Sequence, residues 1–228
     1  MQLPVPLQVS EPLHHRPSSH AVPTPAGDWL HTGPPVLQPI VPGLQVVPQV
    51  MFRLQATHVP VPGLHLRAIH VPGHSEGQVV LHDEADNVLF SADHVLERVT
   101  PNPTVYIPPY RGKTTGLGDY LASLDRLRSL PEDVLVCPGH GRPFRGLNAR
   151  LDEIRAHHDE RARQILGLVE KREEATIVSL AREIWRGLKE AAVVLAAREV
   201  HGHLDLLEQQ GLVSREERSG AWIFRRAG

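Results

Sequence analysis

Cysteine and aromatic residues are scarce in this sequence of 228 residues. Cys137 is the single cysteine, so no disulfide can form within the chain, which fits a reducing compartment. No apolar run approaches the roughly 18 residues that a membrane-spanning helix needs. The start of the chain lacks the basic and then apolar segments of a secretory signal. These absences predict a cytoplasmic protein without membrane contact.

A surplus of charge of either sign is also missing. Charged residues make up 22% of the chain, and the formal net charge is −2. This balance provides no strong attraction to nucleic acid or to an anionic membrane. Histidine is the unusual component, with fifteen copies. The composition therefore gives no reason to expect a nucleic-acid or membrane partner, and histidine is its one unusual component.

Proline and charge divide the chain into three zones. Residues 1–54 hold eleven of the 21 prolines and only four charged residues. Proline blocks helices and central strands, so we expect an irregular, partly extended N-terminal segment. The composition changes abruptly near residue 56, and a shifted reading frame upstream would explain it. That hypothesis is tested by translating the other frames of the gene.

Residues 55–147 have the pattern of an α/β domain. β-Branched runs bounded by proline or glycine predict strands within 64–71, 77–82, 87–95 and 133–141. Leucines at helical spacing predict a helix over 118–130. Asp119 is its expected N-cap, and Pro131 follows its end.

Residues 148–228 contain no proline and have helical patterns. Helices are expected over 148–171 with Asn148 as cap, from Thr176 to 185, and over 190–210 with a stop at Gly211. Two short alternating strands follow on either side of residues 218–220. This order predicts an all-α, winged-helix-like domain over 148–228. Its partners remain open between the α/β domain, a second copy of the chain in a homodimer, and nucleic acid, which the acidic residues of the third helix disfavour.

Two Pro-Gly-His turns stand out in the middle zone. His74 lies in "VPGHS" and His140 in "CPGHG", and both turns follow predicted strands. Proline fixes the entry angle and glycine permits the sharp turn, so each loop presents its imidazole rigidly. Asp93 ends the strand between them. Imidazole and carboxylate together suit zinc, and also iron or manganese.

These motifs, in this order and on this strand–turn–strand pattern, resemble the last three metal-ligand motifs of the metallo-β-lactamase superfamily. The resemblance covers residues 60 to about 146 and implies an αββα sandwich, incomplete in this chain. It also implies that His74 ligates a first metal, that Asp93 bridges two metals and that His140 ligates the second. The C-terminal helices and wing are similar to an extension found in one branch of this superfamily.

The implied activity is a metal-dependent hydrolase acting on a small-molecule substrate, namely a thioester, ester or phosphodiester, with one or two zinc ions. The segment 104–121 is expected as a helical insertion that contacts substrate. Tyr110, Arg111 and Lys113 are its candidate substrate-binding residues, and a basic surface loop is the simpler explanation of the same residues. Of the other histidines, His94 is a candidate to line the pocket, whereas a structural role is expected for the mid-helix pair at 157 and 158.

The family's upstream His-x-His-x-Asp-His motif is not recognisable. Its nearest counterpart is "HHRPSSH" at 14–20, which has arginine and serine where ligands are required. His14, His15, His20, His31 and His58 are the remaining histidines that could complete a site. Three ligands divided between two metals would bind weakly. An inactive relic serving at most as a binding module, and a winged-helix nucleic-acid binder, therefore stay open as alternatives.

Overall fold

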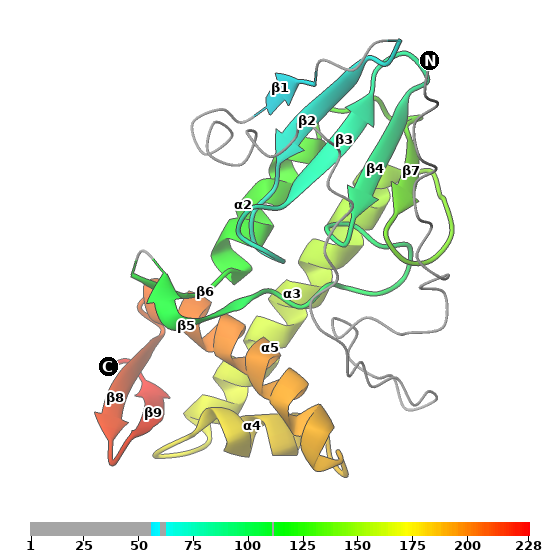
Figure 1. Ribbon diagram of the computed structural model, residues 1–228. Coiled ribbons are helices and arrows are strands. Elements are labelled where there is room, and N and C mark those ends of the chain that lie inside the picture. The colour runs from blue at the N-terminus through cyan, green and yellow to red at the C-terminus, as the bar shows by residue number, and fades with distance from the viewer. Residues whose placement is uncertain (1–55, 60–62, 111) are drawn as a thin grey trace, which may run out of the picture.

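The computed structural model describes residues 56–59, 63–110 and 112–228, and Figure 1 shows how they are arranged. The expectation of an irregular segment over 1–54 falls outside these residues, as do four of the five upstream histidines. Within the described ranges, no helix is long and apolar enough to cross a membrane.

Five strands form the main sheet in the spatial order β1-β2-β3-β4-β7. They are β1 (Ala56–His58), β2 (Leu66–His70), β3 (Val79–Asp83), β4 (Val88–Ala92) and β7 (Leu135–Pro138). Neighbours from β1 to β4 are antiparallel, and β7 is parallel to β4. All four strands expected from the sequence are therefore confirmed. The topology also makes β2, β4 and β7 run in one direction and end at the same edge.

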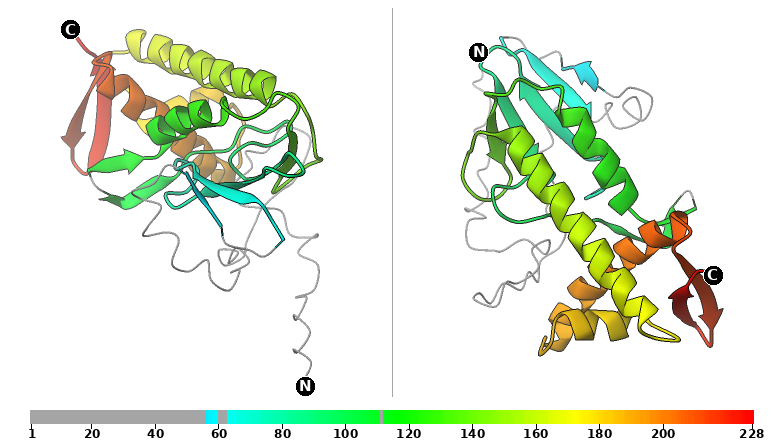
Figure 2. Two further views of the ribbon diagram at one scale, coloured as in Figure 1. Left: turned by 90° about the horizontal axis from the view of Figure 1, so that it is seen from above. Right: turned by 180° about the vertical axis from the view of Figure 1, so that it is seen from behind.

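One face of this sheet packs against α2 (Leu117–Leu127) and the first half of α3 (Leu147–Glu170), as Figure 2 shows from behind. Val80 and Leu89 alternate with outward residues along their strands and are at most 1% exposed. Burying each such side chain stabilises the fold by about 1.5–3 kcal/mol. The main core includes Val71, Val80, Leu89, Val95, Leu117, Tyr120, Leu124, Leu127, Val136, Leu151 and Ile154.

The opposite face of the sheet carries a smaller apolar cluster. It consists of Val59, Leu66, Ala68, Val79 and Leu81. Phe90 of β4 is 47% exposed. The five-stranded sheet thus has α2 and α3 on one face and this small apolar cluster on the other. One sheet with helices on one face corresponds to half of the αββα sandwich that the resemblance implies.

The segment expected as a helical insertion is a hairpin followed by a helix. β5 (Val105–Tyr110) pairs antiparallel with β6 (Lys113–Thr115), and α2 begins only at Leu117. The helical expectation is therefore wrong for residues 105–110 and 113–115. Two consecutive prolines within β5 explain the difference, because a two-stranded ribbon has a free edge that tolerates proline and a helix interior does not.

Two of the four expected helix starts are confirmed, at Thr176 and at Glu190 of α5 (Glu190–Gln209), and only the first has a side-chain cap. Thr176 caps α4 (Ile177–Ile184) by accepting a hydrogen bond from the backbone N–H of Ser179, as expected. The expected caps Asp119 and Asn148 are wrong, since α2 follows Gly116 and α3 follows Gly146. The Asp119 carboxylate instead binds Lys113, within the first turn of its helix.

Helix α3 joins the two halves of the molecule. Leu151 and Ile154 pack into the core beneath the sheet, whereas Ile165 and Val169 belong to a second core. That second core also includes α4, α5 (Glu190–Gln209) and the hairpin of β8 (Val213–Arg218) and β9 (Ala221–Arg226). The order of three helices and a hairpin matches the expectation, while its assignment as a winged helix and the domain boundary at 147/148 remain predictions.

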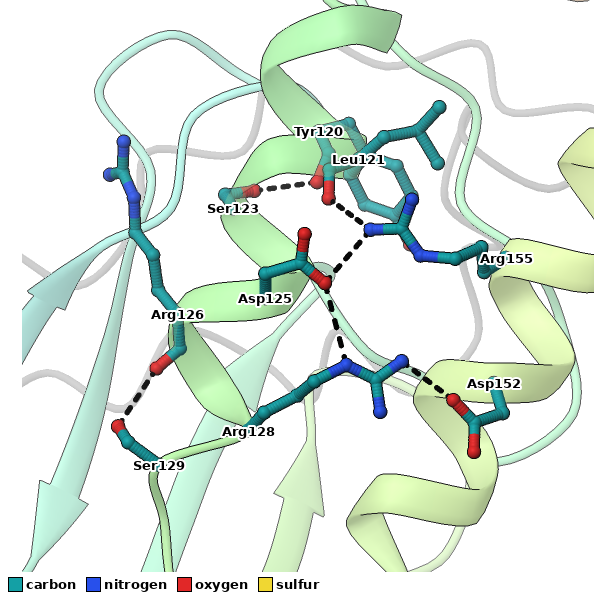
Figure 3. A network of polar contacts seen from close by, with 9 residues as sticks. All are labelled: Tyr120, Leu121, Ser123, Asp125, Arg126, Arg128, Ser129, Asp152 and Arg155. Atoms are coloured by element: carbon teal, nitrogen blue, oxygen red, sulfur yellow. Dashed lines mark hydrogen bonds and ion pairs between the residues drawn. The ribbon is translucent and has the colours of Figure 1, made fainter.

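An exposed polar network also fastens α2 to α3 (Figure 3). Arg155 of α3 donates to the carbonyl of Leu121 and to a carboxylate oxygen of Asp125, both at 2.9 Å. Arg128 donates to Asp152 of α3 at 2.6 Å. Exposed pairs of this kind contribute at most about 1 kcal/mol each, so the apolar core remains the main connection between the two helices.

Candidate metal centre

The three predicted ligands follow the three strands that end at one edge of the sheet. His74 lies four residues after β2, Asp93 directly follows β4, and His140 lies two residues after β7. Because β2, β4 and β7 run in the same direction, their loops meet at that edge. Two histidines that are distant in sequence are thereby brought to one carboxylate.

The end of β4 is shaped to present Asp93. The register between β4 and β7 shifts between Phe90 and Ala92, and Ala92 has a positive φ of 46°. Gly139 donates its backbone N–H to the Ala92 carbonyl at 2.8 Å. A Cβ on Gly139 would lie 2.6 Å from Asp93 Oδ1, so glycine is required for this approach. Bulges and unusual backbone angles of this kind commonly re-aim side chains at functional sites.

Asp93 stands between the two histidines. His74 Nε2 lies 3.9 Å from Asp93 Oδ2, and His140 Nε2 lies 3.4 Å from Asp93 Oδ1. Each imidazole thus faces a different oxygen of the same carboxylate. The structure brings all three predicted ligands together, with the Asp93 carboxylate between the two imidazole nitrogens.

The tautomer of His74 follows from its backbone contact. Its Nδ1–H donates to the carbonyl of Asn102 at 2.9 Å, so Nε2 carries the lone pair on the side of Asp93. Burial lowers the pKa of His74 below 6.5, although the Asp93 charge opposes that shift. A neutral imidazole held by a backbone carbonyl is the usual state of a histidine that binds metal.

His140 has the opposite electrostatic environment. Contact with Asp93 raises its pKa above 6.5, and burial only partly offsets this. The His140 side chain is 51% exposed, whereas that of His74 is 7% exposed. Among the described residues, the three-residue group is therefore more open to solvent at His140 than at His74.

A buried layer supports the turn that carries His74. The Tyr120 hydroxyl donates to the carbonyl of His94 at 2.9 Å, and Ser123 Oγ lies 3.1 Å from His94 Nε2. Gly73 has a φ of 133°, and a Cβ there would lie 2.3 Å from Cα of Tyr120. The turn therefore sits directly on α2. His94 is fully buried, and burial lowers its pKa to about 3, so it supports the site as a neutral group and does not line an open pocket.

The described residues contribute no further ligand. His58 pairs with Arg67 in the β1–β2 register, which places it at the opposite edge, where it contacts Glu84 at 3.1 Å. In the described ranges, no group of three or more histidine, cysteine, aspartate or glutamate side chains is arranged so that it could hold a metal ion by itself. The expected lack of the upstream motif concerns residues outside those ranges.

The chemistry of the donor set nevertheless fits a metal ion. Asp93 offers two oxygens, His74 offers an unprotonated nitrogen fixed by Asn102, and His140 offers a nitrogen on the accessible side. Gly139 leaves room for this carboxylate position. His74, Asp93 and His140 would therefore hold part of the coordination shell.

Two of the three candidate substrate-binding residues lie on the β5–β6 hairpin. Tyr110 ends β5, Arg111 lies outside the described residues, and Lys113 begins β6. The Lys113 ammonium donates to both oxygens of Asp119, at 2.6 and 2.7 Å. Lys113 is therefore engaged in an exposed ion pair, and the role of the three residues in binding stays a prediction.

A second pair of histidines lies inside the helical half. His158 of α3 is 2% exposed and its Nδ1 lies 3.2 Å from His203 Nε2 of α5. His203 Nδ1–H donates to the Glu199 carbonyl at 2.7 Å, so the His158 Nδ1–H is the donor within the pair. The inward orientation of one member of 157 and 158 is confirmed, since His157 is 41% exposed.

Comparison with known proteins gives a consistent result. The family model described as the metallo-beta-lactamase superfamily matches residues 14–140. The probable metallo-hydrolase YqjP of Bacillus subtilis is 26% identical over 147 residues, which are 64% of this chain and 46% of the relative. A Gallus gallus protein named acyl-coenzyme A thioesterase MBLAC2 is 35% identical over 82 residues, 35% of this chain and 27% of the relative.

Solved structures agree with the sequence relatives. A β-lactamase domain protein from Burkholderia ambifaria superposes with a TM-score of 0.67 at 32% identity, over 75% of this chain and 50% of that chain. A metallo-β-lactamase family protein from Thermus thermophilus gives a TM-score of 0.62 at 30% identity, over 75% and 52% of the two chains. The chain spans about half the length of the Bacillus relative and of both structures.

Proposed function

This chain belongs to the metallo-β-lactamase superfamily, and on that premise we propose that it is a metal-dependent hydrolase with its centre at His74, Asp93 and His140. The observation that carries the proposal is the position of two imidazole nitrogens at opposite oxygens of one carboxylate. Its hydrolase homologues favour this function over the inactive relic and over the nucleic-acid binder.

Each residue has a distinct task in the proposed site. His74 presents Nε2, because its other nitrogen donates to Asn102. Asp93 presents two oxygens and balances the charge of bound cations. His140 completes the group on the accessible side. Zinc, iron or manganese held there would supply Lewis acidity to the carbonyl or phosphorus centre of the substrate.

A thioester is the substrate class to test first. One relative is named an acyl-coenzyme A thioesterase, whereas esters and phosphodiesters are further classes that the same chemistry permits. The β5–β6 hairpin with Tyr110, Arg111 and Lys113 is the proposed substrate-contacting element. Site chemistry, and not the fold, decides among these substrates.

The C-terminal half is proposed as a winged-helix-like module that packs on the α/β half. Thr114 and Thr115 of β6 donate to the two carboxylate oxygens of Asp205 on α5, at 3.1 and 3.0 Å. The four arginines of the hairpin contact carboxylates: Arg215 with Glu208, Arg218 and Arg225 with Glu174 and Glu216, and Arg226 with Glu170. Paired arginines favour packing over nucleic-acid binding. A homodimer and a cytoplasmic location remain predictions.

A direct assay tests the hydrolase proposal. The full chain is loaded separately with zinc, manganese and iron(II), and given an acyl-coenzyme A thioester, a p-nitrophenyl ester and bis-p-nitrophenyl phosphate. The matched variants are Asp93→Asn, which keeps the shape of the carboxylate, and His58→Gln, which removes a histidine at the opposite edge. Hydrolysis by the wild type and by His58→Gln, but not by Asp93→Asn, is expected. Equal rates in all three chains would refute the proposal.

A further inference from the structure

Arg198 of α5 lacks the ion pair or hydrogen bond that the other buried or half-buried arginines of the described ranges make, although Arg67 and Arg215 also each have one sealed nitrogen without a partner. The Arg198 side chain is half-buried, and its Nε is sealed from solvent without a hydrogen-bond partner. Every other buried or half-buried arginine there donates to a carbonyl or contacts a carboxylate. The carboxylate of the neighbouring Glu199 accepts from Arg161 at 2.8 Å.

The position of Arg198 connects it with the candidate metal centre. Gly202 follows Arg198 by one helical turn and so lies on the same side of α5. A Cβ on Gly202 would lie 3.3 Å from Pro103 and 3.4 Å from Leu117, so this side of α5 faces the loop around residue 103. The preceding residue, Asn102, holds His74 through its carbonyl.

An unpaired guanidinium in this environment is unfavourable in the absence of a ligand. Burial lowers the pKa of Arg198, which means that the surroundings disfavour its charge. A partly desolvated charge without a partner destabilises a folded chain, and binding an anion would relieve that penalty. The planar guanidinium fork is suited to two parallel hydrogen bonds with phosphate or carboxylate.

We propose that Arg198 binds an oxyanionic group, phosphate or carboxylate, of the substrate that reaches His74, Asp93 and His140. This assignment rests on the proposed hydrolase function for the identity of the ligand as substrate. It extends the site from the α/β half to the helical half. It also narrows the substrate to a molecule that carries a negative charge away from the bond that is cleaved.

Anion binding is measured without metal, so that the result does not depend on hydrolysis. The full chain in EDTA is titrated with inorganic phosphate and, separately, with succinate at low ionic strength, and amide chemical shifts report binding. Arg198→Gln is expected to weaken binding of at least one anion tenfold or more, and Arg198→Lys to weaken it less. Arg182→Gln removes an exposed arginine of α4 and is the matched control, with unchanged binding.

The anion that loses affinity identifies the source of the oxyanion. Weaker phosphate binding by Arg198→Gln assigns a substrate that carries phosphate. Weaker succinate binding by the same variant assigns a substrate that carries a carboxylate. If Arg198→Gln binds both anions as the wild type does, or if the wild type binds neither, the proposal is overturned.

Stability separates a binding role from a structural one. Arg150 is 9% exposed and donates to the carbonyls of Leu96 and Val99, so Arg150→Gln is expected to lower the midpoint of urea denaturation. Arg198→Gln is expected to leave the midpoint unchanged or to raise it, because no bond is lost. A fall as large as that of Arg150→Gln would make Arg198 structural and contradict the proposal.

Kinetics distinguish failure of this inference from failure of the proposed function. In an active, metal-loaded chain, Arg198→Gln should raise KM for an acyl-coenzyme A thioester and leave kcat largely unchanged. The N-acetylcysteamine thioester of the same acyl group lacks the phosphates and should lose nothing. If the chain binds anions through Arg198 and hydrolyses none of the substrates, only the proposed hydrolase function is refuted. An active chain whose kinetics and anion binding are unchanged by Arg198→Gln refutes only the anion site.

Discussion

The two histidine groups of this molecule have the same side chains and different chemistry. His74 and His140 lie in turns at a sheet edge on either side of Asp93, and one of them is half exposed. His158 and His203 lie within helices, bond to each other and have no carboxylate between them. Burial lowers the pKa of His158 to about 2 and that of His203 to about 4.

The difference shows what makes a histidine cluster a candidate for chemistry. At the sheet edge, a backbone carbonyl fixes one nitrogen of His74 and turns the other toward a carboxylate and a solvent-exposed partner. Between α3 and α5, the Nδ1–H of His158 donates to Nε2 of His203, and the pair forms a neutral bridge in the core. Short distance between histidines is common to both groups, whereas a central carboxylate and access belong only to the first.

The largest effect is expected at the turn that carries His74. Gly73→Ala would place a Cβ 2.3 Å from the Tyr120 backbone at a φ of 133°, and it should destabilise the fold by about 3 kcal/mol or more. Gly167→Ala in α3 meets no atom within 4 Å and should stabilise the helix by about 0.5–1 kcal/mol. Urea denaturation measures both. Equal effects would mean that the sheet-edge turn is not restricted as described.

Removal of the Asp93 carboxylate should lower zinc affinity, whereas a change in the buried pair of His158 and His203 should not. Asp93→Ala is expected to lower zinc affinity roughly 100-fold or more, because even outer partners of metal ligands contribute 10–100-fold. His158→Leu should leave zinc affinity unchanged, since that residue lies in the buried pair. Competition with a chromogenic chelator measures the affinity. A loss of zinc in His158→Leu alone would reverse the assignment of the two groups.

The buried pair should make stability fall in acid. Both histidines have folded-state pKa values below the unfolded value of about 6.5, so the unfolded chain binds more protons as the pH falls. Their contribution is complete above pH 6.5 and is lost below it, down to about pH 4 for His203, with a slope approaching about 1.4 kcal/mol per pH unit for each group.

Chemical denaturation between pH 7 and pH 4 tests this dependence. The double variant His158→Leu/His203→Leu should have a shallower decline than the wild type. An unchanged slope would show that the pair does not resist protonation in the folded state.

The smallest change in stability is expected for Tyr120, in the buried layer that supports the His74 turn. Tyr120→Phe removes the hydroxyl that donates to the His94 carbonyl inside the core, and should lower the free energy of unfolding by about 1–2 kcal/mol. Leu124→Met, at a neighbouring buried position of α2, changes shape without removing a hydrogen bond and is the control. If Tyr120→Phe has no effect, the hydroxyl does not support the turn.

Local pattern predicted much of the fold and the position of the three ligands. Strand and helix periods identified four strands of the main sheet and the helices α2 to α5, and the Pro-Gly-His turns identified His74 and His140. The hairpin of β5 and β6 was missed, because its pairing depends on a partner strand and not on its own periodicity. The starts of α2 and α3 were also missed, because Gly116 and Gly146 precede these helices and have no side chain that could form a cap. Thr176 has such a side chain, and the start of α4 was predicted correctly.

The support of the site was not accessible from sequence. The carbonyl that orients His74 belongs to Asn102, and every residue type carries the same backbone group, so no side-chain pattern marks it. The helix that carries Arg198, α5, packs through Gly202 on Pro103 and on Leu117, next to the residue that holds His74. Such contacts between distant segments leave no periodicity, and they become visible only when the helices are packed.

The central claim is that His74, Asp93 and His140 together hold a metal ion. Anomalous X-ray scattering at the zinc edge, from crystals of the full chain grown with zinc, tests it most directly. The account predicts an anomalous peak within coordinating distance of Asp93 and of Nε2 of His74 or His140, and no such peak in Asp93→Ala. Density that lies elsewhere, or a peak that persists in Asp93→Ala, would contradict it.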